Sequence, residues 1–385
     1  MATRQYIGID EKARRVRKAY IGIDNVARRI KKAYIGVNGV ARLCYSANGP
    51  ERVALLDFPG NRRYLASASV GSGNDAYAVF AGGGLYDNDT LSSCFSTVYA
   101  YDRDLTRQQL SNLSVGCMQM ASASDASHAF FLGGRYNGGY TDRAYAYDTS
   151  LTLTNMASLK QNGGYGNTRA AMAGDKLITV GGSNKYIEYY DSTLTKKYGS
   201  TTANNMGWCV ATRLGPSMAS FAGGTENTTA IAINNDVSIT VMEAPSGTNA
   251  SGSAATHCDC AVFFWGRGAY IDVYDYDTLV KRTIGTCSIE YTASISIGDY
   301  LFLAGGTRKD EAANTTYYYS TITVRDSLFI LLPTTGYLLN SKRHIAACAI
   351  GDAALFACGQ GYTKDEEGNT PWVDYNTLEV FKYVS

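Results

Sequence analysis

The chain has 385 residues, of which 45% are apolar, and its 35 basic and 34 acidic side chains give a net charge of +1. No stretch approaches the roughly 18 apolar residues of a membrane-spanning helix, and the start Met1-Ala-Thr-Arg4 lacks the apolar core of a secretory signal. We therefore expect no membrane insertion and no export by the ordinary secretory route. Forty glycines and only six prolines are typical of many short strands joined by turns.

The first 45 residues repeat with a period of 14. The copies begin at Tyr6, Tyr20 and Tyr34, and each holds an extended Tyr-Ile-Gly-Ile/Val run, a turn, and a run in which apolar and basic residues alternate. Asn38-Gly39 in the third copy is a strong hairpin-turn signal. The repeats therefore predict stacked short β-hairpins, with a helix over 12–18 as the alternative.

Charge separates this arm from the rest of the chain. Residues 1–50 hold 11 Lys and Arg against three acidic residues, a balance of +8, which leaves 24 against 31, or −7, for residues 51–385. Basic residues in such an arm can neutralise nucleic-acid phosphates. The aromatic residues recur at fixed packing positions, however, and no nucleic-acid-binding fold is visible. Attachment or assembly is therefore favoured over nucleic-acid binding, and docking on an acidic surface of a neighbouring protein is a third option.

The arm also resembles a known module. The pattern Tyr-Ile-Gly-Val-Asp/Asn-Gly-Val-Ala-Arg is similar to short repeats in tail-associated and other virion proteins of phages and prophages of Gram-positive gut bacteria. The copy that begins at Tyr34 matches in full, and the first two depart from it at the turn. The resemblance implies a phage particle as the setting, made in the bacterial cytoplasm, with residues 1–45 contacting other virion proteins and the chain forming a homo-oligomer.

Seven units follow the arm, and each has an apolar run that ends in a glycine stop. The first glycines lie at 82, 133, 181, 223, 266, 305 and 359, so that successive stops are 39–54 residues apart. This spacing brackets the roughly 50-residue period of kelch repeats. After each stop comes a strand with Tyr-Asp or a remnant of it: Tyr101-Asp102, Tyr147-Asp148, Tyr190-Asp191, Asn235-Asp236, Tyr276-Asp277, Arg325-Asp326 and Tyr383.

Residues 51–385 therefore resemble the kelch-repeat family, although the Trp that the family usually places after Tyr-Asp is missing. The last unit ends at 378–384 without an outer strand, and the segment 51–58 has the period-2 pattern needed to supply it. We predict an all-β chain, a seven-bladed kelch-like β-propeller with an N-terminal short β-hairpin repeat arm. The domains are 1–50 and 51–385, and the strand 51–58 completes the seventh blade.

One short segment differs completely from unit to unit, just before each innermost strand. These positions are expected to surround the mouth of the central channel, and repeats that diversify one exposed position behave like a binding surface. Relaxed selection of exposed positions would produce a similar pattern. The candidates are Arg62, Arg63, Tyr64, Gln119, Arg169, Trp208, His257, Asp259, Glu290, Tyr291, Arg343 and His344.

The loops after the glycine stops are longest in units one, two, six and seven, which are neighbours if the propeller closes. They are rich in Tyr, Asn, Gly and Asp, a composition that adaptable recognition loops use. Simple drift in loop length is the alternative. These loops add Tyr136, Tyr362 and Trp372 to the candidate ligand-binding residues.

Signals for catalysis are few. The three histidines, His128, His257 and His344, stand at different distances before their glycine stops, and no His-Glu-x-x-His or Gly-x-Ser-x-Gly motif is present. Cys258 and Cys260, with His257 beside them, resemble half of a metal site on one strand face, and packing thiols are the favoured interpretation. We expect no enzyme activity, no metal and no cofactor.

The sequence thus predicts a tail-associated virion recognition protein whose propeller face binds a host-surface receptor, a glycan in preference to a protein. One alternative is an intracellular protein-interaction propeller with a basic nucleic-acid-binding tail. A glycan-processing enzyme is the other, because Asp and Glu residues on different blades could form a catalytic pair.

Overall fold

The computed structural model describes residues 6–384, apart from 10–11, 16–19, 24–25, 30–31, 38–39, 47–48, 88–89, 161–167, 182–184, 225–228, 248–251, 267–269, 311–314 and 363–371. The described residues form strands and one short 3-10 helix, η1 (Gly73–Asp75). The chain is therefore all-β, as predicted. None of these residues belongs to a helix long and apolar enough to cross a membrane.

The arm consists of antiparallel strand pairs, one in each repeat. The pairs are β1 (Tyr6–Ile9) with β2 (Lys12–Arg15), β3 (Tyr20–Ile23) with β4 (Val26–Arg29), and β5 (Lys32–Val37) with β6 (Val40–Ser46). Because β2 is extended, the helical alternative over 12–18 does not hold for Lys12–Arg15. The Asn38-Gly39 turn lies outside the described residues.

Within the described part of the chain, seven antiparallel sheets have four strands each. The first four are β8 (Ala66–Val70), β9 (Tyr77–Ala81), β12 (Val98–Tyr101), β13 (Arg107–Gln109); β14 (Ala121–Ser124), β15 (His128–Leu132), β18 (Ala144–Asp148), β19 (Leu153–Met156); β20 (Thr168–Ala173), β21 (Lys176–Gly181), β22 (Tyr186–Tyr190), β23 (Lys196–Thr201); and β24 (Val210–Leu214), β25 (Met218–Ala222), β26 (Ala230–Asn234), β27 (Ile239–Met242). The other three are β28 (Ser253–His257), β29 (Cys260–Trp265), β30 (Tyr270–Tyr274), β31 (Lys281–Gly285); β32 (Ala293–Ile297), β33 (Tyr300–Ala304), β36 (Thr321–Arg325), β37 (Gly336–Tyr337); and β39 (Ala346–Ile350), β40 (Ala353–Ala357), β43 (Thr377–Val384), β7 (Gly49–Asp57).

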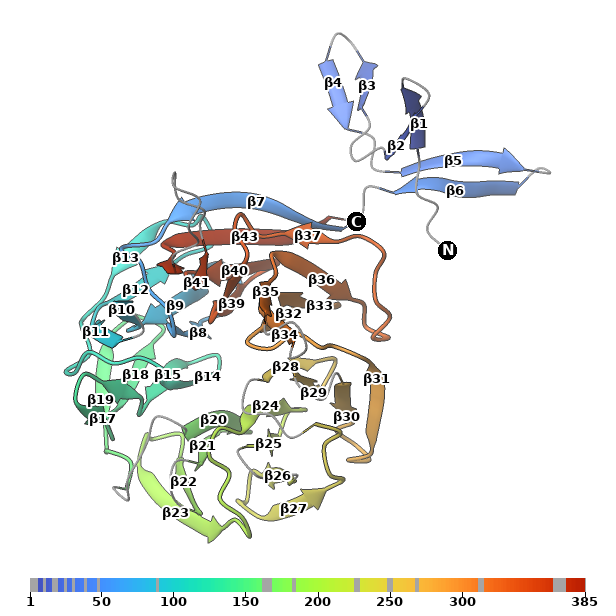
Figure 1. Ribbon diagram of the computed structural model, residues 1–385. Coiled ribbons are helices and arrows are strands. Elements are labelled where there is room, and N and C mark those ends of the chain that lie inside the picture. Colours follow the sequence, from blue (N-terminus) through green and yellow to red (C-terminus); the bar gives the residue numbers. More distant parts are fainter. Residues whose placement is uncertain are drawn as a thin grey trace.

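The last sheet combines the two ends of residues 49–384. β43 pairs along its whole length with β7, from Thr377 opposite Asp57 to Val384 opposite Gly49. Figure 1 shows these strands side by side, β7 in blue and β43 in red. A buried ion pair reinforces the junction, because Lys342 Nζ lies 3.0 Å from Glu379 Oε1 and both side chains are fully buried.

The sheets are arranged around a common centre (Figure 1). Their innermost strands are β8, β14, β20, β24, β28, β32 and β39. β8 contacts β14, and the contacts continue through β20, β24, β28, β32 and β39, which in turn contacts β8. The residues of these strands alternate in environment. In β8, Ala66, Ala68 and Val70 are buried, whereas Ser67 and Ser69 line the central cavity. Small residues suit positions where neighbouring strands approach closely.

The apolar core is divided into seven clusters, one between each pair of neighbouring sheets. In the cluster between the last sheet and the first, Phe58 packs edge-to-face on Phe80, with ring centroids 5.8 Å apart. Burial of one such ring stabilises the fold by about 1.5–3 kcal/mol. Because every contact between neighbouring sheets has its own cluster, the stability is spread over all of these contacts.

The Tyr-Asp pairs have a local structural role. The tyrosine is buried at the end of the third strand, and the carboxylate of the aspartate accepts backbone N–H groups of the following turn. Asp148 Oδ1, for example, accepts the N–H groups of Ser150 and Thr152, both at 2.9 Å. Such Asx turns are the reason for the repeated aspartate.

Two of the predicted Tyr-Asp assignments are wrong. In the fifth unit the pair is Tyr274-Asp275 rather than Tyr276-Asp277, because Asp275 Oδ1 accepts the N–H groups of Asp277 and Thr278. In the fourth unit the turn begins at Asn234, not at Asn235-Asp236, since Asn234 and Ser238 form its closing backbone bond.

The extra strands belong to units one, two, six and seven, where the loops are longest. They are β10 (Gly84–Asp87) with β11 (Thr90–Cys94), β16 (Arg135–Tyr136) with β17 (Gly139–Tyr140), β34 (Thr307–Asp310) with β35 (Thr315–Tyr318), and a sheet of β38 (Lys342–Arg343), β41 (Gln360–Tyr362) and β42 (Trp372–Asp374).

Candidate functional site

One residue position recurs two residues before the first strand of a sheet and has an unusual backbone. Tyr64, Gln119, Trp208, Tyr291 and His344 all adopt a left-handed conformation, with φ between 55° and 63°. For a residue with a side chain this conformation costs about 1–2 kcal/mol. The same strained geometry in five units indicates that the fold turns the chain sharply here and holds each side chain in one direction.

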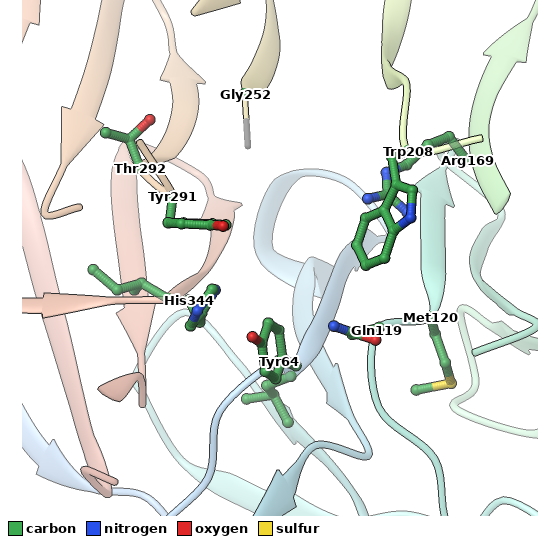
Figure 2. Close-up of a pocket in the computed structure, with 11 residues that line it drawn as sticks. Tyr64, Gln119, Met120, Arg169, Trp208, Gly252, Tyr291, Thr292 and His344 are labelled. Atoms are coloured by element: carbon green, nitrogen blue, oxygen red, sulfur yellow. The ribbon is translucent and has the colours of Figure 1, made fainter. Parts of the chain in front are cut away.

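These five side chains and Arg169, the second residue of β20, line a pocket of about 220 Å³. The lining is completed by Gly252 and by the residues that directly follow four of the six side chains: Leu65, Met120, Thr292 and Ile345. Figure 2 shows the six side chains arranged around one space, with Trp208 and Arg169 on one side and Tyr64, Tyr291 and His344 on the other. Residues more than 200 positions apart in the sequence therefore meet at one site.

The wall formed by Tyr64, His344 and Tyr291 is a continuous aromatic cluster. The centroid of the His344 ring lies 4.1 Å from that of Tyr64 and 4.6 Å from that of Tyr291. Opposite this wall, the Arg169 guanidinium carbon lies 5.9 Å from the centroid of the Trp208 ring. The pocket thus offers flat aromatic faces on both sides, with the Gln119 amide between them (Figure 2).

Burial determines the protonation of the titratable pocket residues. It lowers the pKa of His344 well below its usual value of 6.5, and the positive charges of Arg343 and Arg63 lower it further. Burial also raises the pKa of Tyr64 to about 12. At neutral pH the imidazole is therefore uncharged and the phenol keeps its proton, so both groups act as neutral hydrogen-bonding partners.

In the four units with extra strands, a backbone pairing supports the pocket residue. Arg63 pairs with Gly84, Met118 with Arg135, Glu290 with Thr307 and Arg343 with Gln360, and each of these residues directly precedes a pocket residue. The hairpins therefore brace the turns that hold Tyr64, Gln119, Tyr291 and His344.

A central cavity of about 340 Å³ is lined by the innermost strands. Its lining is dominated by Ser, Ala and Thr, with Arg213 and Cys348 among the exceptions. The hydroxyl groups link neighbouring sheets: Ser67 Oγ donates to Ala347 O at 2.7 Å, and Thr256 Oγ1 donates to Arg213 O at 2.6 Å. These bonds between sheets indicate a structural role for the hydroxyl groups that form them.

Six predicted candidates, then, line the pocket: Tyr64, Gln119, Arg169, Trp208, Tyr291 and His344. Arg63 and Arg343 lie behind them. Arg63 Nε is 3.6 Å from Asp374 Oδ1, and its guanidinium carbon is 3.6 Å from the centroid of the Tyr86 ring. Arg343 Nε donates to Gln360 Oε1 at 3.1 Å. Both arginines influence the pocket through its electrostatic potential.

The placement of Arg62 at the channel mouth is wrong. Its side chain is 2% exposed, donates to the carbonyl groups of Pro59 and Gly82, and lies over the Phe95 ring at 4.2 Å. Arg62 is therefore a core residue that joins backbone segments. Tyr64, whose backbone is left-handed, lines the pocket, whereas Arg62 lies among the rings of Phe58, Phe95 and Tyr99.

His257 and Asp259 are also misplaced by the prediction, because they lie at the opposite end of β28 from Gly252, the unit-five residue that lines the pocket. His257 is buried, with Nδ1 2.7 Å from Ser296 Oγ and Nε2 3.1 Å from Asp326 O. Cys258 and Asp259 form the turn between β28 and β29, so Cys258 and Cys260 do not share a strand face. Cys258 is exposed and Cys260 is buried.

Glu290 does not line the pocket either; it is buried and its backbone pairs with Thr307. Tyr136 lies on the β16–β17 hairpin, outside the pocket lining. Tyr362 and Trp372 form an aromatic cluster with Tyr318, in which the Tyr362 and Trp372 ring centroids are 4.1 Å apart. Tyr362 is 36% and Trp372 38% exposed, so this cluster is a partly exposed aromatic surface.

Sequence reasoning missed five lining residues: Leu65, Met120, Gly252, Thr292 and Ile345. All except Gly252 directly follow predicted pocket residues, so widening the diversified position by one residue would have found them. No comparable signal identifies Gly252. No known protein-family model matches the chain, and no curated protein sequence matches it.

Proposed function

We propose that the seven four-stranded sheets are the blades of a closed β-propeller of the kelch type, with residues 1–50 as a separate arm. The pairing of β7 with β43, the successive contacts among the innermost strands and the apolar cluster between the last and first sheets support closure. A sheet whose outer strand comes from the other end of the chain is a common way for propellers to close without a free edge.

We further propose that the pocket binds a ligand from the surface of a host cell. The observation that carries this proposal is the convergence of six side chains of five chemical types, from six of the seven units, on one space. The packing between units does not require this diversity, because the apolar clusters between neighbouring sheets are formed by other residues. Diversity confined to one concave site is typical of recognition surfaces.

A glycan is the ligand class that fits the pocket. Trp208, Tyr64 and Tyr291 present flat aromatic surfaces, on which sugar rings pack through their C–H groups. Gln119, the tyrosine hydroxyl groups and the neutral His344 supply hydrogen-bond donors and acceptors for sugar hydroxyl groups. The exposed cluster of Tyr362 and Trp372 adds an aromatic surface near Arg343, whose guanidinium carbon lies 4.8 Å from the Trp372 ring.

The arm suggests where the protein works. The three repeats, the balance of +8 in residues 1–50 and the resemblance to repeats of phage virion proteins support attachment to a particle. We propose that the protein is a homo-oligomeric, tail-associated virion protein that the arm anchors and that recognises the host through the pocket.

The test is binding of the full-length protein to intact bacterial cells and to an array of bacterial glycans. Trp208→Ala and Tyr291→Ala should each lower affinity at least ten-fold while circular dichroism and the unfolding midpoint show a folded chain. Tyr198→Ala, which removes a 55% exposed tyrosine on β23 far along the sheet from the pocket strand β20, is the matched control and should bind normally. Equal binding by all variants would refute the pocket as the site, and salt-sensitive DNA binding by the protein without any cell or glycan binding would favour the nucleic-acid alternative.

A further inference from the structure

The pocket contains a positive charge that lacks an acidic partner. Arg169 Nη1 donates to its neighbour Thr168 O at 2.9 Å, and the guanidinium faces the Trp208 ring. Among the residues that the structure describes, Arg169 forms no ion pair with a carboxylate. A guanidinium has five N–H donors in a planar arrangement, so most of the hydrogen-bonding capacity of Arg169 is available to a ligand.

Three other buried cations of the protein are compensated. Lys342 is 3.0 Å from Glu379, Lys196 is 3.2 Å from Glu188, and Arg62 donates to backbone carbonyl groups of two residues. Removing a charge from water is costly unless the charge is paired or hydrogen-bonded. Burial lowers the pKa of Arg169, yet among the described residues its guanidinium donates only to Thr168 O. Arg325, which donates to Phe329 O, is in a similar position but does not line the pocket.

The remaining pocket residues do not balance this charge. None of the described lining residues is Asp or Glu. Tyr64 and His344 are neutral, and Arg343 lies behind the opposite wall with its guanidinium carbon 5.5 Å from the Tyr291 ring. The potential inside the pocket is therefore positive, and the low dielectric of the site strengthens its attraction for an anion.

We propose that the ligand is an acidic glycan, whose carboxylate or phosphate group is bound by Arg169 while its sugar ring packs on Trp208. The planar guanidinium matches both anionic groups, which can accept two parallel N–H bonds from it. The inference rests on the proposed glycan-binding function and specifies the chemical class of the ligand.

The experiment uses the full-length protein and matched pairs of glycans that differ only in charge. One arm compares glucuronic-acid-containing and sialylated oligosaccharides with their carboxyl-reduced or asialo counterparts. A second arm compares a phosphorylated oligosaccharide with the same oligosaccharide after removal of its phosphate group. The variants are Arg169→Gln, Arg169→Lys and the control Arg107→Gln, which removes the same charge from an exposed position on β13.

We expect the acidic member of a pair to bind at least ten-fold more tightly than the neutral one. Arg169→Gln should weaken acidic-glycan binding about ten- to hundred-fold, as for loss of a hydrogen bond to a charged group, and should abolish the preference. Arg169→Lys should restore it only in part, and Arg107→Gln should have no effect. The arm in which the preference appears identifies the anion as carboxylate or phosphate.

Two results would overturn the inference, and they differ in what they say of the function. If neutral and acidic members bind equally and Trp208→Ala, but not Arg169→Gln, abolishes binding, the pocket recognises glycans without using the charge. If no glycan of either kind binds, both the acidic ligand and the proposed function are wrong.

Discussion

The buried pair Lys342 and Glu379 offers a direct test of how the two ends of the chain are joined. Glu379 lies on β43, and its Oε2 accepts hydrogen bonds from Arg52 Nη1 of β7 at 2.9 Å and from the N–H group of Leu339 at 2.7 Å. Lys342 Nζ also donates to Thr377 Oγ1 at 2.8 Å. One carboxylate thus links β7, β43 and the segment before β38.

Glu379→Gln removes the negative charge and leaves Lys342 buried without a counter-ion. Breaking a buried pair from one side costs about 3–5 kcal/mol of unfolding free energy, which is a large part of the 5–15 kcal/mol typical of a domain. The matched control is Lys382→Ala, which breaks the exposed Lys382–Asp352 pair on the same strand and should cost at most about 1 kcal/mol.

The assay is urea unfolding of the full-length protein, followed by tryptophan fluorescence at several pH values. Burial lowers the pKa of Lys342, and Glu379 raises it, so the Gln variant should have an even lower Lys342 pKa. Its cost should therefore shrink as pH rises from 7 to 9 and the lysine loses its proton. The double variant Lys342→Met/Glu379→Leu should be more stable than Glu379→Gln. A cost for Glu379→Gln no larger than that of Lys382→Ala would refute the reasoning.

Three further predictions concern other sites. Burial lowers the pKa of His344 and of His257, so below pH 6.5 the unfolded chain binds protons that the native protein does not. Stability is therefore retained above pH 6.5 and lost below it, by up to about 1.4 kcal/mol per pH unit for each histidine. The pH dependence of stability, followed by thermal unfolding, should be about half as steep for His344→Gln as for the wild type, and an unchanged pH dependence would contradict this account. Arg62→Ala should lower the free energy of unfolding in urea by about 3 kcal/mol, because packing and hydrogen bonds are lost. The fraction that remains folded should bind glycan normally. Loss of binding by the folded protein would mean that Arg62 belongs to the binding site. Asp148→Ala should lower the free energy of unfolding by about 1 kcal/mol, because the turn loses its hydrogen-bond acceptor. Asp148→Asn, which keeps a side-chain oxygen, should lower it less in the same assay. Equal losses would mean that the turn does not depend on that oxygen.

Local features of the chain were enough to predict the repeated units. A glycine stop can be recognised in the sequence because the requirement for glycine arises at that single position. Gly82 has φ +70°, and a Cβ there would lie 2.2 Å from Cys117 O. The Tyr-Asp remnants, the small residues of the innermost strands and the strand at the front of residues 51–385 are likewise short-range patterns. Aligning the units also located Tyr64, Gln119, Trp208, Tyr291 and His344, because each lies two residues before the innermost strand of its sheet with the same left-handed backbone; it located Arg169 at the start of β20 as well.

The errors arose where spacing within a unit shifts or where direction depends on the surroundings. In the fifth unit Gly252, just before β28, lines the pocket, whereas the predicted residue His257 lies at the far end of β28. Aligning the units by chemical variety alone does not define the register of the strand. Arg62 and Arg63 are adjacent and equally basic, yet one is enclosed by Phe58, Phe95 and Tyr99 whereas the other pairs with Asp374.

The sequence by itself therefore determined the all-β class, the repeat boundaries and which positions vary. Only the tertiary structure decided which of the varied side chains share one pocket, that the described pocket residues include no carboxylate, and that Arg169 lacks an acidic partner there. The physical reason is that these properties belong to contacts between different units, from Arg169 with Trp208 to Tyr64 with His344, and neither burial nor charge compensation at such contacts is encoded in any short stretch of chain.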